Sequence, residues 1–369
     1  MKIALIAPPW YPIPPIGYGG IEIVVADLAK GYQASGNDVV LIAPGDSKVE
    51  VPMLPIVERH VGLELGETER DALTEELTKK QFRLALEAGA EIVHDHTDWP
   101  HPGDYSIPVV RTVHGPNVER AVRLYAELTK AGDCFVGISE RQRELFRDAA
   151  TRLLGSADAI RFAGVVHNPI DVASVPFESR KQPYAFFLGR CDWEKNPEAS
   201  IRVARAAGMK LKMALRVNSY ERPYFEENVE PLLGPDIELL AEISPSEKYE
   251  LLAGAQVVLF TSQWEEPFGL VMTEGAACGT PVVAFSRGAA PEIIVDGLTG
   301  FLVETEDEMT AAVGRVGSID PYACRRHMEA HFSPEVSASK YVHIFSDILA
   351  QRAASGQTGN EPSANERSG

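Results

Sequence analysis

The sequence predicts an α/β protein built from two doubly wound, Rossmann-like domains. Short apolar runs alternate with amphipathic helical stretches along the chain, and this alternation indicates parallel sheets covered by helices. The runs are apolar almost throughout, which is typical of strands buried on both faces. The chain of 369 residues also exceeds the size at which a single core usually stops growing. Two sheets therefore fit the sequence better than one.

The expected strands fall into two sets. The first set consists of residues 2–7, 38–43, 92–94, 109–113 and 134–138. The second set consists of residues 185–188, 211–215, 237–240, 257–260 and 281–285. Helices are expected between the strands, for example over 21–33, where Gly36 follows the helix, and over 68–88.

A loop-like stretch at 167–181 separates the two sets and marks the predicted joint between the domains. We expect an N-terminal domain over 1–168 and a C-terminal domain over 169–335. Residues 336–352 are expected to form a helix that packs back towards the N-terminal domain, and the polar tail 353–369 is expected to be disordered. Doubly wound sheets bind ligands outside the carboxyl ends of their strands, so the cleft between the domains is the expected site.

Charge and hydropathy argue against several classes of protein. The formal net charge is −18 and the pI is ≈ 5.0, whereas a nucleic-acid-binding protein shows a basic face. The longest apolar runs are too short to span a bilayer, and the first ten residues resemble a strand more than a signal peptide. The four cysteines show no CxxC spacing, which indicates reduced thiols. We therefore expect a cytoplasmic protein without a transmembrane segment or a nucleic-acid partner.

Two glutamates with seven residues between them, Glu266 and Glu274, form the first candidate site. Pro267 and Gly269 predict a loop, and residues 271–278 predict a helix after it. An anion can bind at the start of a helix, and carboxylates accept hydrogen bonds from hydroxyl groups. A sugar nucleotide offers both kinds of group. The alternative is that Glu274 caps the helix and Glu266 is a solvated loop charge.

The segment EPFGLVMTEGAACGTPVVAF, followed by PEIIVDGLTGFLV, resembles the signature of the retaining glycosyltransferases of family 4. These enzymes have the GT-B fold, in which two Rossmann-like domains face each other across a cleft. The resemblance implies that the N-terminal domain, 1–168, binds the acceptor and that the C-terminal domain, 169–335, binds the nucleotide sugar. Their Glu-x7-Glu hallmark matches Glu266 and Glu274. Further segments resemble family motifs in the same order along the chain: YGGIE at 18–22, TVHG at 112–115, HNPID at 167–171 and GRCDWEKN at 189–196.

Arg190 and Lys195 follow the first strand of the second domain, with Asp192 and Glu194 between them. Taken alone, this pattern also fits a solvated charged loop. A leaving nucleoside diphosphate needs positive charge, and a fixed Arg and Lys can supply it without a metal. The resemblance assigns that role to Arg190 and Lys195. The sequence contains no Asp-x-Asp motif, so we expect no metal and no other cofactor.

The resemblance implies further contacts with the donor. Gly19 and Gly20 would lie beside the diphosphate and the acceptor, where glycine lets the backbone approach a ligand. His114 would lie beside the transferred sugar, although a buried, hydrogen-bonded histidine is the common alternative. Glu274 would bind the ribose hydroxyls and Glu266 the hydroxyls of the donor sugar. Backbone N–H groups near Glu266 would assist it: those of Phe268, Gly269 and Leu270.

Two stretches have less definite roles. Arg216 and Asn218 occupy a turn where the family usually has a Gly-rich segment, and we expect them near the phosphate or the sugar; the base is expected near 241–244. In the stretch HDHTDW, His94 and His96 point the same way at a strand end, but no third zinc ligand is evident. An acceptor-binding wall that includes Trp99 is the favoured interpretation.

The predicted function is a metal-independent transfer of a hexose, with retention, from a UDP- or GDP-linked sugar to a hydroxyl acceptor. In the family, the leaving phosphate helps to deprotonate the incoming hydroxyl on the same face of the sugar. A retaining hydrolase would need two carboxylates about 5 Å apart across the anomeric carbon, whereas two carboxylates in one loop–helix segment approach from one side. A sugar-nucleotide epimerase of the same fold and a non-catalytic sugar-nucleotide-binding protein remain alternatives.

Overall fold

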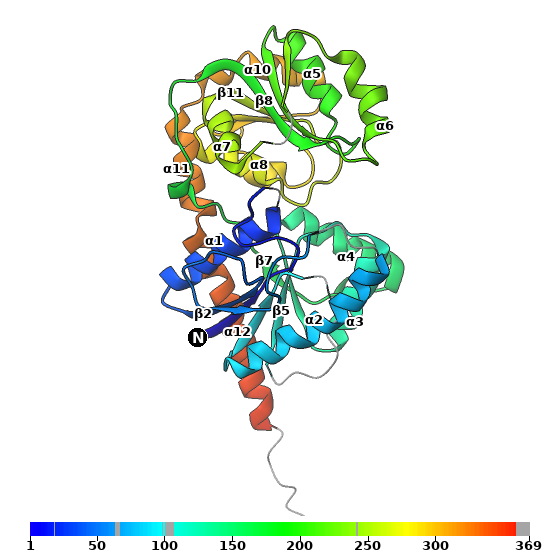
Figure 1. Ribbon diagram of the computed structural model, residues 1–369, viewed down its shortest axis with the longest axis vertical. Coiled ribbons are helices and arrows are strands. Elements are labelled where there is room, and N and C mark those ends of the chain that lie inside the picture. Colours follow the sequence, from blue (N-terminus) through cyan, green and yellow to red (C-terminus); the bar gives the residue numbers. More distant parts are fainter. Residues whose placement is uncertain (18, 63–66, 98, 100–106, 241–242, 359–369) are drawn as a thin grey trace, which may run out of the picture.

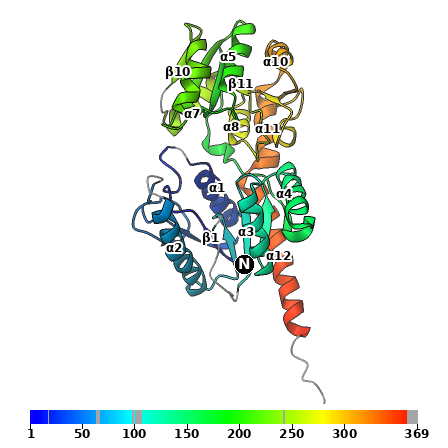
Figure 2. The same cartoon turned by 90° about the vertical axis from the view of Figure 1, so that its right-hand side faces the viewer.

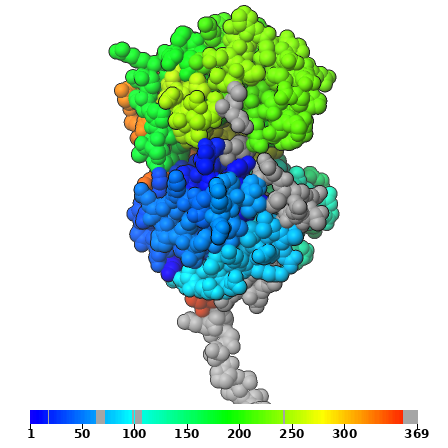
Figure 3. Space-filling view, viewed as in Figure 1, coloured from blue at the N-terminus to red at the C-terminus, as the bar shows by residue number. Residues whose placement is uncertain are grey.

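The computed structural model describes residues 1–17, 19–62, 67–97, 99, 107–240 and 243–358. These residues form two lobes, and the surface narrows between them (Figures 1 and 3). The N-terminus lies in the first lobe, and the C-terminal helix runs from the second lobe down the side of the first (Figures 1 and 2).

The first lobe contains a parallel sheet that, within the described residues, has seven strands. Its strands are β1 (Lys2–Ile6), β2 (Asp38–Ala43), β3 (Met53–Pro55), β4 (Ile92–Asp95), β5 (Val109–Val113), β6 (Cys134–Gly137) and β7 (Phe162–Val165). Their order is β3-β2-β1-β4-β5-β6-β7. The helices of this lobe are α1 (Gly20–Ala34), α2 (Glu67–Glu87), α3 (Glu119–Lys130) and α4 (Glu140–Leu154).

The second lobe contains a parallel sheet of six described strands in the order β10-β9-β8-β11-β12-β13. These are β8 (Gln182–Arg190), β9 (Lys210–Arg216), β10 (Ile237–Leu240), β11 (Ala255–Phe260), β12 (Val282–Phe285) and β13 (Gly300–Val303). The helices here are α5 (Pro197–Ala206), α6 (Arg222–Tyr224), α7 (Pro245–Gly254), α8 (Leu270–Ala277), α9 (Ala290–Ile293), α10 (Glu306–Val313) and α11 (Pro321–Phe332). The two sheets confirm the predicted fold class.

Burial on both faces explains why the strands are apolar throughout. In β1, Ile3 and Leu5 pack into a core with α1 on one face of the sheet, whereas Ala4 and Ile6 pack against α2 on the other. All four residues are fully buried. Successive side chains of a strand point to opposite faces, so a strand between two layers of helices needs apolar residues at every position.

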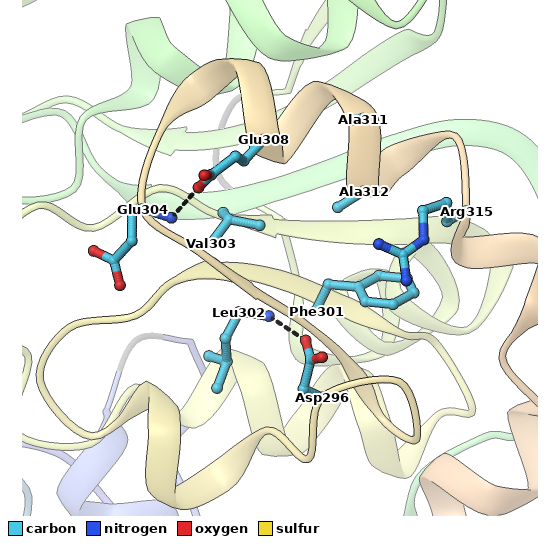
Figure 4. A pocket seen from close by; sticks show the side chains of 9 residues that line it. All are labelled: Asp296, Phe301, Leu302, Val303, Glu304, Glu308, Ala311, Ala312 and Arg315. Carbon is cyan, nitrogen blue, oxygen red and sulfur yellow. Dashed lines mark hydrogen bonds between the residues drawn. The ribbon is translucent and has the colours of Figure 1, made fainter.

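The strands that the sequence did not predict are β3, β7 and β13, and each lies at the edge of a sheet. The residues of β3 and β7 are half-buried or exposed, so these strands lack the buried apolar run that marks a central strand. The exposed side of β13 is protected by carboxylates, because Asp296 accepts the N–H of Leu302 and Glu308 accepts the N–H of Glu304 (Figure 4). Occupied edge groups discourage pairing with another chain.

The last helix, α12 (Pro334–Thr358), joins the two lobes. Its Tyr341 and Phe345 are buried in the first lobe against Val24 and Leu28 of α1. The helix continues to Thr358, so the prediction of disorder was wrong for residues 353–358. Once a helix has formed, each added residue extends it at little cost, and this stretch includes the strong helix former alanine. Residues 359–369 lie outside the described part. Among the described helices, none has the length and apolar content that a membrane crossing needs.

Candidate functional site at the interdomain boundary

Predicted donor-binding residues of both lobes lie where the two lobes meet. The N-terminal ends of α1 and α8 face each other across this boundary (Figures 1 and 2). A Cβ atom placed on Gly20, at the start of α1, would lie 3.3 Å from Cδ1 of Leu270, at the start of α8. The carboxyl ends of parallel strands and the starts of the following helices lie on the same side of a sheet, so both sheets direct their binding edges here.

Glu266 is at the centre of the second-lobe side. Its carboxylate forms an ion pair with Nζ of Lys195 and accepts hydrogen bonds from Trp264 Nε1 (2.7 Å) and Ser262 Oγ (3.2 Å). The side chains of Lys195 and Glu266 are only 18% and 12% exposed. The loop carrying Glu266 requires glycine at position 288, because a Cβ atom there would lie 2.4 Å from the Glu266 nitrogen. The carboxylate is therefore held in a fixed place beside a cation.

Aromatic packing holds the turn between Glu266 and α8 in place. Phe268 is buried and its ring lies against His167 and Phe332, with centroids 6.0 and 6.3 Å away. Gly269 has a φ of 93°, which side-chain-bearing residues rarely adopt, and it precedes the first residue of α8, Leu270. The first N–H groups of a helix have no partner inside the helix. The segment thus presents backbone donors in the turn that follows Glu266.

Arg190 ends strand β8 and is held by two carboxylates. Its guanidinium contacts Asp192 (2.8 Å) and Glu194 (2.6 Å). The sheet register places Arg190 beside Arg216 of β9, whose Nε lies 3.3 Å from Oδ1 of Asn218. The two arginines therefore reach the same edge of the sheet, where the sequence placed the phosphate. Of the segment 241–244 expected to bind the base, residues 241 and 242 lie outside the described residues.

Glu274, in the middle of α8, is buried and has two partners that the sequence did not reveal. Lys248 Nζ lies 2.5 Å from its carboxylate, and the hydroxyl of Tyr249 donates to it over 3.3 Å. Burial and the charge of Glu274 raise the pKa of Tyr249 well above its usual range. Both partners lie in α7, the helix that precedes β11. In the sequence, a lysine beside polar residues in such a helix resembles an ordinary solvated helix face. No sequence signal distinguishes them.

The first-lobe side carries histidines and buried acids. His114 follows β5 and is half-buried, and burial lowers its pKa to about 4. Its Nε2 lies 2.8 Å from Nδ1 of His96, which follows β4. On α1, burial raises the pKa of Glu22 and of Asp27 to about 7 in each case. Asp27 accepts the backbone N–H of Asp171 in the segment between the domains (2.9 Å).

The expectation that His94 lines an acceptor wall does not fit its position, and for Trp99 it stays a prediction. His94 is fully buried, and its two ring nitrogens contact Tyr32 Oη and Thr112 Oγ1, each over 2.8 Å. Trp99 packs edge-to-face on Trp10, with ring centroids 5.8 Å apart, at the margin of the α2 core. The side chain of His94 is therefore committed to the interior of the first lobe, whereas Trp99 is only half-buried.

Contacts across the boundary fix the Glu266 loop against α4. The hydroxyl of Ser139 donates to the carbonyl of Pro267 (2.7 Å), and Arg141 forms a bidentate ion pair with Glu265 (2.9 Å for each bond). Glu292 accepts the N–H of Arg141 (2.8 Å) at the start of α4, where a negative charge is favoured by the helix dipole. The two lobes are therefore joined by specific polar contacts next to the site.

Two other findings concern cavities and metals. A cavity of about 400 Å³ lies between β13 and α10, lined in part by Phe301, Glu308 and Arg315, and none of the predicted site residues lines it (Figure 4). Within the described residues, no three His, Cys, Asp or Glu side chains gather as a metal site would require. The four cysteines are free and buried.

Comparison with known sequences identifies the family. Residues 18–174 match the sequences described as Glycosyltransferase Family 4, and residues 173–319 match those described as Glycosyl transferases group 1. The chain belongs to the family 4 glycosyltransferases. The two matches together include the Glu-x7-Glu pair, the Arg190–Lys195 segment and His114.

Relatives of this glycosyltransferase are similar over nearly the whole chain. Phosphatidyl-myo-inositol mannosyltransferase of Mycolicibacterium smegmatis is 25% identical over 95% of the chain and 92% of its own length. The structure of AviGT4, a glycosyltransferase involved in avilamycin A biosynthesis, is 24% identical with a TM-score of 0.70, covering 95% of this chain and 98% of that one. Anabaena Alr3699/HepE, in complex with UDP and glucose, is 17% identical with a TM-score of 0.68, covering 94% and 100%. These structures confirm the GT-B fold.

Proposed function

We propose that this glycosyltransferase retains the anomeric configuration and moves a hexose from a UDP- or GDP-linked donor to a hydroxyl acceptor without a metal. One observation carries the proposal. Arg190, Lys195, Glu266 and Glu274 all lie at the binding edge of the second sheet, and each is held in an ion pair. Donor complexes of a structural relative support a nucleotide sugar as the donor, since Alr3699/HepE binds UDP and glucose.

The cations would stabilise the leaving diphosphate. In the structure, Lys195 forms an ion pair with Glu266, and Arg190 forms ion pairs with Asp192 and Glu194. A diphosphate carries more negative charge than a single carboxylate and can replace these partners, while the arginine can bind it through two parallel hydrogen bonds. Fixed positive charge that faces developing negative charge is the main electrostatic contribution to such a reaction.

The two glutamates would recognise hydroxyl groups. Release of Lys195 frees the Glu266 carboxylate to accept hydrogen bonds from the transferred sugar. Glu274, which is held beside Lys248, would accept hydrogen bonds from the ribose hydroxyls. Both lie in one loop–helix segment and approach the donor from the same side, which suits transfer on the front face better than a double displacement. The acceptor hydroxyl would then lose its proton to an oxygen of the leaving phosphate.

The test is a donor panel followed by analysis of the product. The protein is incubated with UDP-, GDP- and ADP-linked hexoses and a set of hydroxyl acceptors, and release of nucleoside diphosphate is measured. The anomeric proton coupling of the product then gives its configuration, and we expect that of the donor. An inverted product would contradict the retaining mechanism.

The same experiment separates the alternatives, which the family comparison does not favour. An epimerase would convert the donor into another sugar nucleotide and leave no glycosylated acceptor. A non-catalytic binding protein would shift in melting temperature with the donor but would neither transfer nor slowly hydrolyse it. Transfer to any hydroxyl acceptor, or slow release of free sugar, is the result that the proposal predicts.

A further inference from the structure

Three histidines form a line of rings behind the first-lobe face of the site. His94 lies in β4, His96 follows β4 and His114 follows β5. The ring centroids of His94 and His96 are 4.3 Å apart, and those of His96 and His114 are 5.1 Å apart. The sequence suggested that His96 contacts an acceptor, but its side chain is only 2% exposed. A residue this deeply buried acts on the substrate through a neighbour, and the neighbour is His114.

The two nitrogens of His96 have different surroundings. Nδ1 lies 2.8 Å from Nε2 of His114, which is the distance of a hydrogen bond. Nε2 is buried and has no hydrogen-bond partner among the residues that the structure describes. Burial lowers the pKa of His96 well below its usual value and that of His114 to about 4, so each ring carries one proton at neutral pH. One ring must then donate and the other must accept.

The unpaired atom decides which ring donates. A buried N–H group without an acceptor is rarer in proteins than a buried acceptor without a donor. The proton of His96 is therefore better placed on Nδ1, where it has a partner, than on Nε2, which has none within the described part of the chain. His96 then donates to Nε2 of His114, and the proton of His114 must lie on its other nitrogen, Nδ1.

We infer that His96 is a positioning residue, which fixes His114 as the Nδ1–H tautomer and so makes the free ring nitrogen of His114 a hydrogen-bond donor towards the sugar. The inference rests on the proposed function for its substrate, but not for the tautomer itself. It gives His114 a single task, which is to donate to a sugar hydroxyl oxygen. His114 in this state cannot accept a proton at Nδ1.

A pair of matched variants tests the inference by kinetics. The amide of asparagine reaches about as far as Nδ1 of histidine, whereas the amide of glutamine reaches about as far as Nε2. His96→Asn can therefore keep the bond to His114, and His96→Gln cannot. We expect His96→Gln to lower kcat by about tenfold, the equivalent of one hydrogen bond, with little change in the KM of the donor. His96→Asn should recover most of that loss.

Equal losses in His96→Asn, His96→Gln and His96→Leu would show that His96 only fills space, and would overturn the inference. A rise confined to the KM of the acceptor would show that His96 binds the acceptor, and would also overturn it. These kinetic outcomes require that the wild type transfers sugar, so a second measurement is needed that does not depend on the donor.

Nuclear magnetic resonance of protein labelled with ¹⁵N at histidine provides that measurement. The signal of His114, assigned with a His114→Gln variant, should show the Nδ1–H tautomer in the wild type and in His96→Asn. In His96→Gln it should move towards the Nε2–H form. A wild-type His114 protonated on Nε2 would overturn the inference, whether or not the protein proves to be a transferase of the proposed kind.

Discussion

Three cations on the second-lobe face are each held by carboxylates, whereas the three histidines of the first-lobe side are buried or half-buried and neutral. Lys195 rests on Glu266 and Lys248 on Glu274, while Arg190 rests on two acids. Across the boundary, burial lowers the pKa of each histidine in the line. Ion pairs can exchange one partner for a charged ligand, but a neutral face can only offer hydrogen bonds. The difference supports the proposal that the diphosphate binds to the charged face of the second lobe, while the first lobe meets only uncharged groups of the substrates.

The acidic residues of the first-lobe face also carry less charge than usual. Burial raises the pKa of Glu22 and Asp27 to about 7, so both carboxyls are partly protonated at neutral pH. Glu266 and Glu274 differ from these two acids because each has a lysine beside it. A buried carboxyl keeps its charge only when a cation or several donors compensate for lost water. The first-lobe face thus limits negative charge next to the place proposed for the diphosphate.

Removing a cation from the charged face should have the largest effect. We expect Lys195→Ala to lower kcat/KM by about 10²–10³, because the leaving diphosphate loses a fixed positive charge. Steady-state kinetics with the best donor measures this. Lys210→Ala, which removes an exposed lysine at the far end of β9, is the matched control. A loss no greater than that of the control would contradict the role given to Lys195.

Removing a carboxylate should weaken binding of the nucleotide. Glu274→Gln is expected to raise the Kd of the nucleoside diphosphate by roughly ten- to a hundredfold, since a charge-assisted hydrogen bond to the ribose is lost. Calorimetric titration measures the Kd, and Glu250→Gln, on the exposed side of α7, is the control. Unchanged affinity in the Glu274 variant would show that the ribose binds elsewhere.

The neutral face can be tested through the pH dependence of stability. The pKa of Asp27 is raised from 3.8 to about 7 in the folded state, so the folded protein binds more protons than the unfolded chain between these values. The stability that this group contributes is present below about pH 4 and is lost as the pH rises to about 7. Asp27→Asn cannot ionise, so its advantage over the wild type should grow over that range to on the order of 2 kcal/mol.

Urea unfolding of both proteins from pH 4 to pH 8 gives this difference, with the exposed Asp148→Asn as the control. Histidine ionisation changes stability in the opposite direction over part of this range, but it is common to both proteins and cancels in the difference. An advantage that stays constant with pH would mean that Asp27 is ionised normally and that the face tolerates charge.

The smallest expected effect is that of metal removal. In the proposed mechanism, Lys195 and Arg190 supply the positive charge that a divalent ion supplies in many other transferases, so excess EDTA should leave the rate of transfer unchanged. Initial rates with EDTA, and after addition of Mg²⁺ or Mn²⁺, check this. Loss of activity with EDTA that Mg²⁺ or Mn²⁺ restores would refute the role proposed for the two cations.

The sequence was most informative where structure and chemistry are local. Glu266, Gly269 and the start of α8 lie in one continuous segment, so strand, loop and helix signals place them together. Arg190 and Lys195 follow a buried strand in the same way. The family resemblance and the fold class, which depend on such segments, are confirmed.

The partners of these residues were not predictable, because they come from distant parts of the chain. Thr112 and Tyr341, which share a hydrogen bond behind the histidines, are 229 residues apart. Lys248 looks like a surface lysine in the sequence and proves to hold Glu274. The sequence placed His94 at an acceptor surface because His94 and His96 point the same way at the end of a strand. However, α1 and α12 cover that face of the sheet.

Thermal unfolding with UDP, GDP and ADP, all in excess EDTA, tests the division between the two faces most directly. The account predicts that one nucleoside diphosphate raises the Tm of the wild type and of His96→Gln, because both keep the charged face, and fails to raise that of Lys195→Ala. A nucleotide-induced shift that survives Lys195→Ala but disappears in His96→Gln would place the diphosphate on the wrong face and contradict the account.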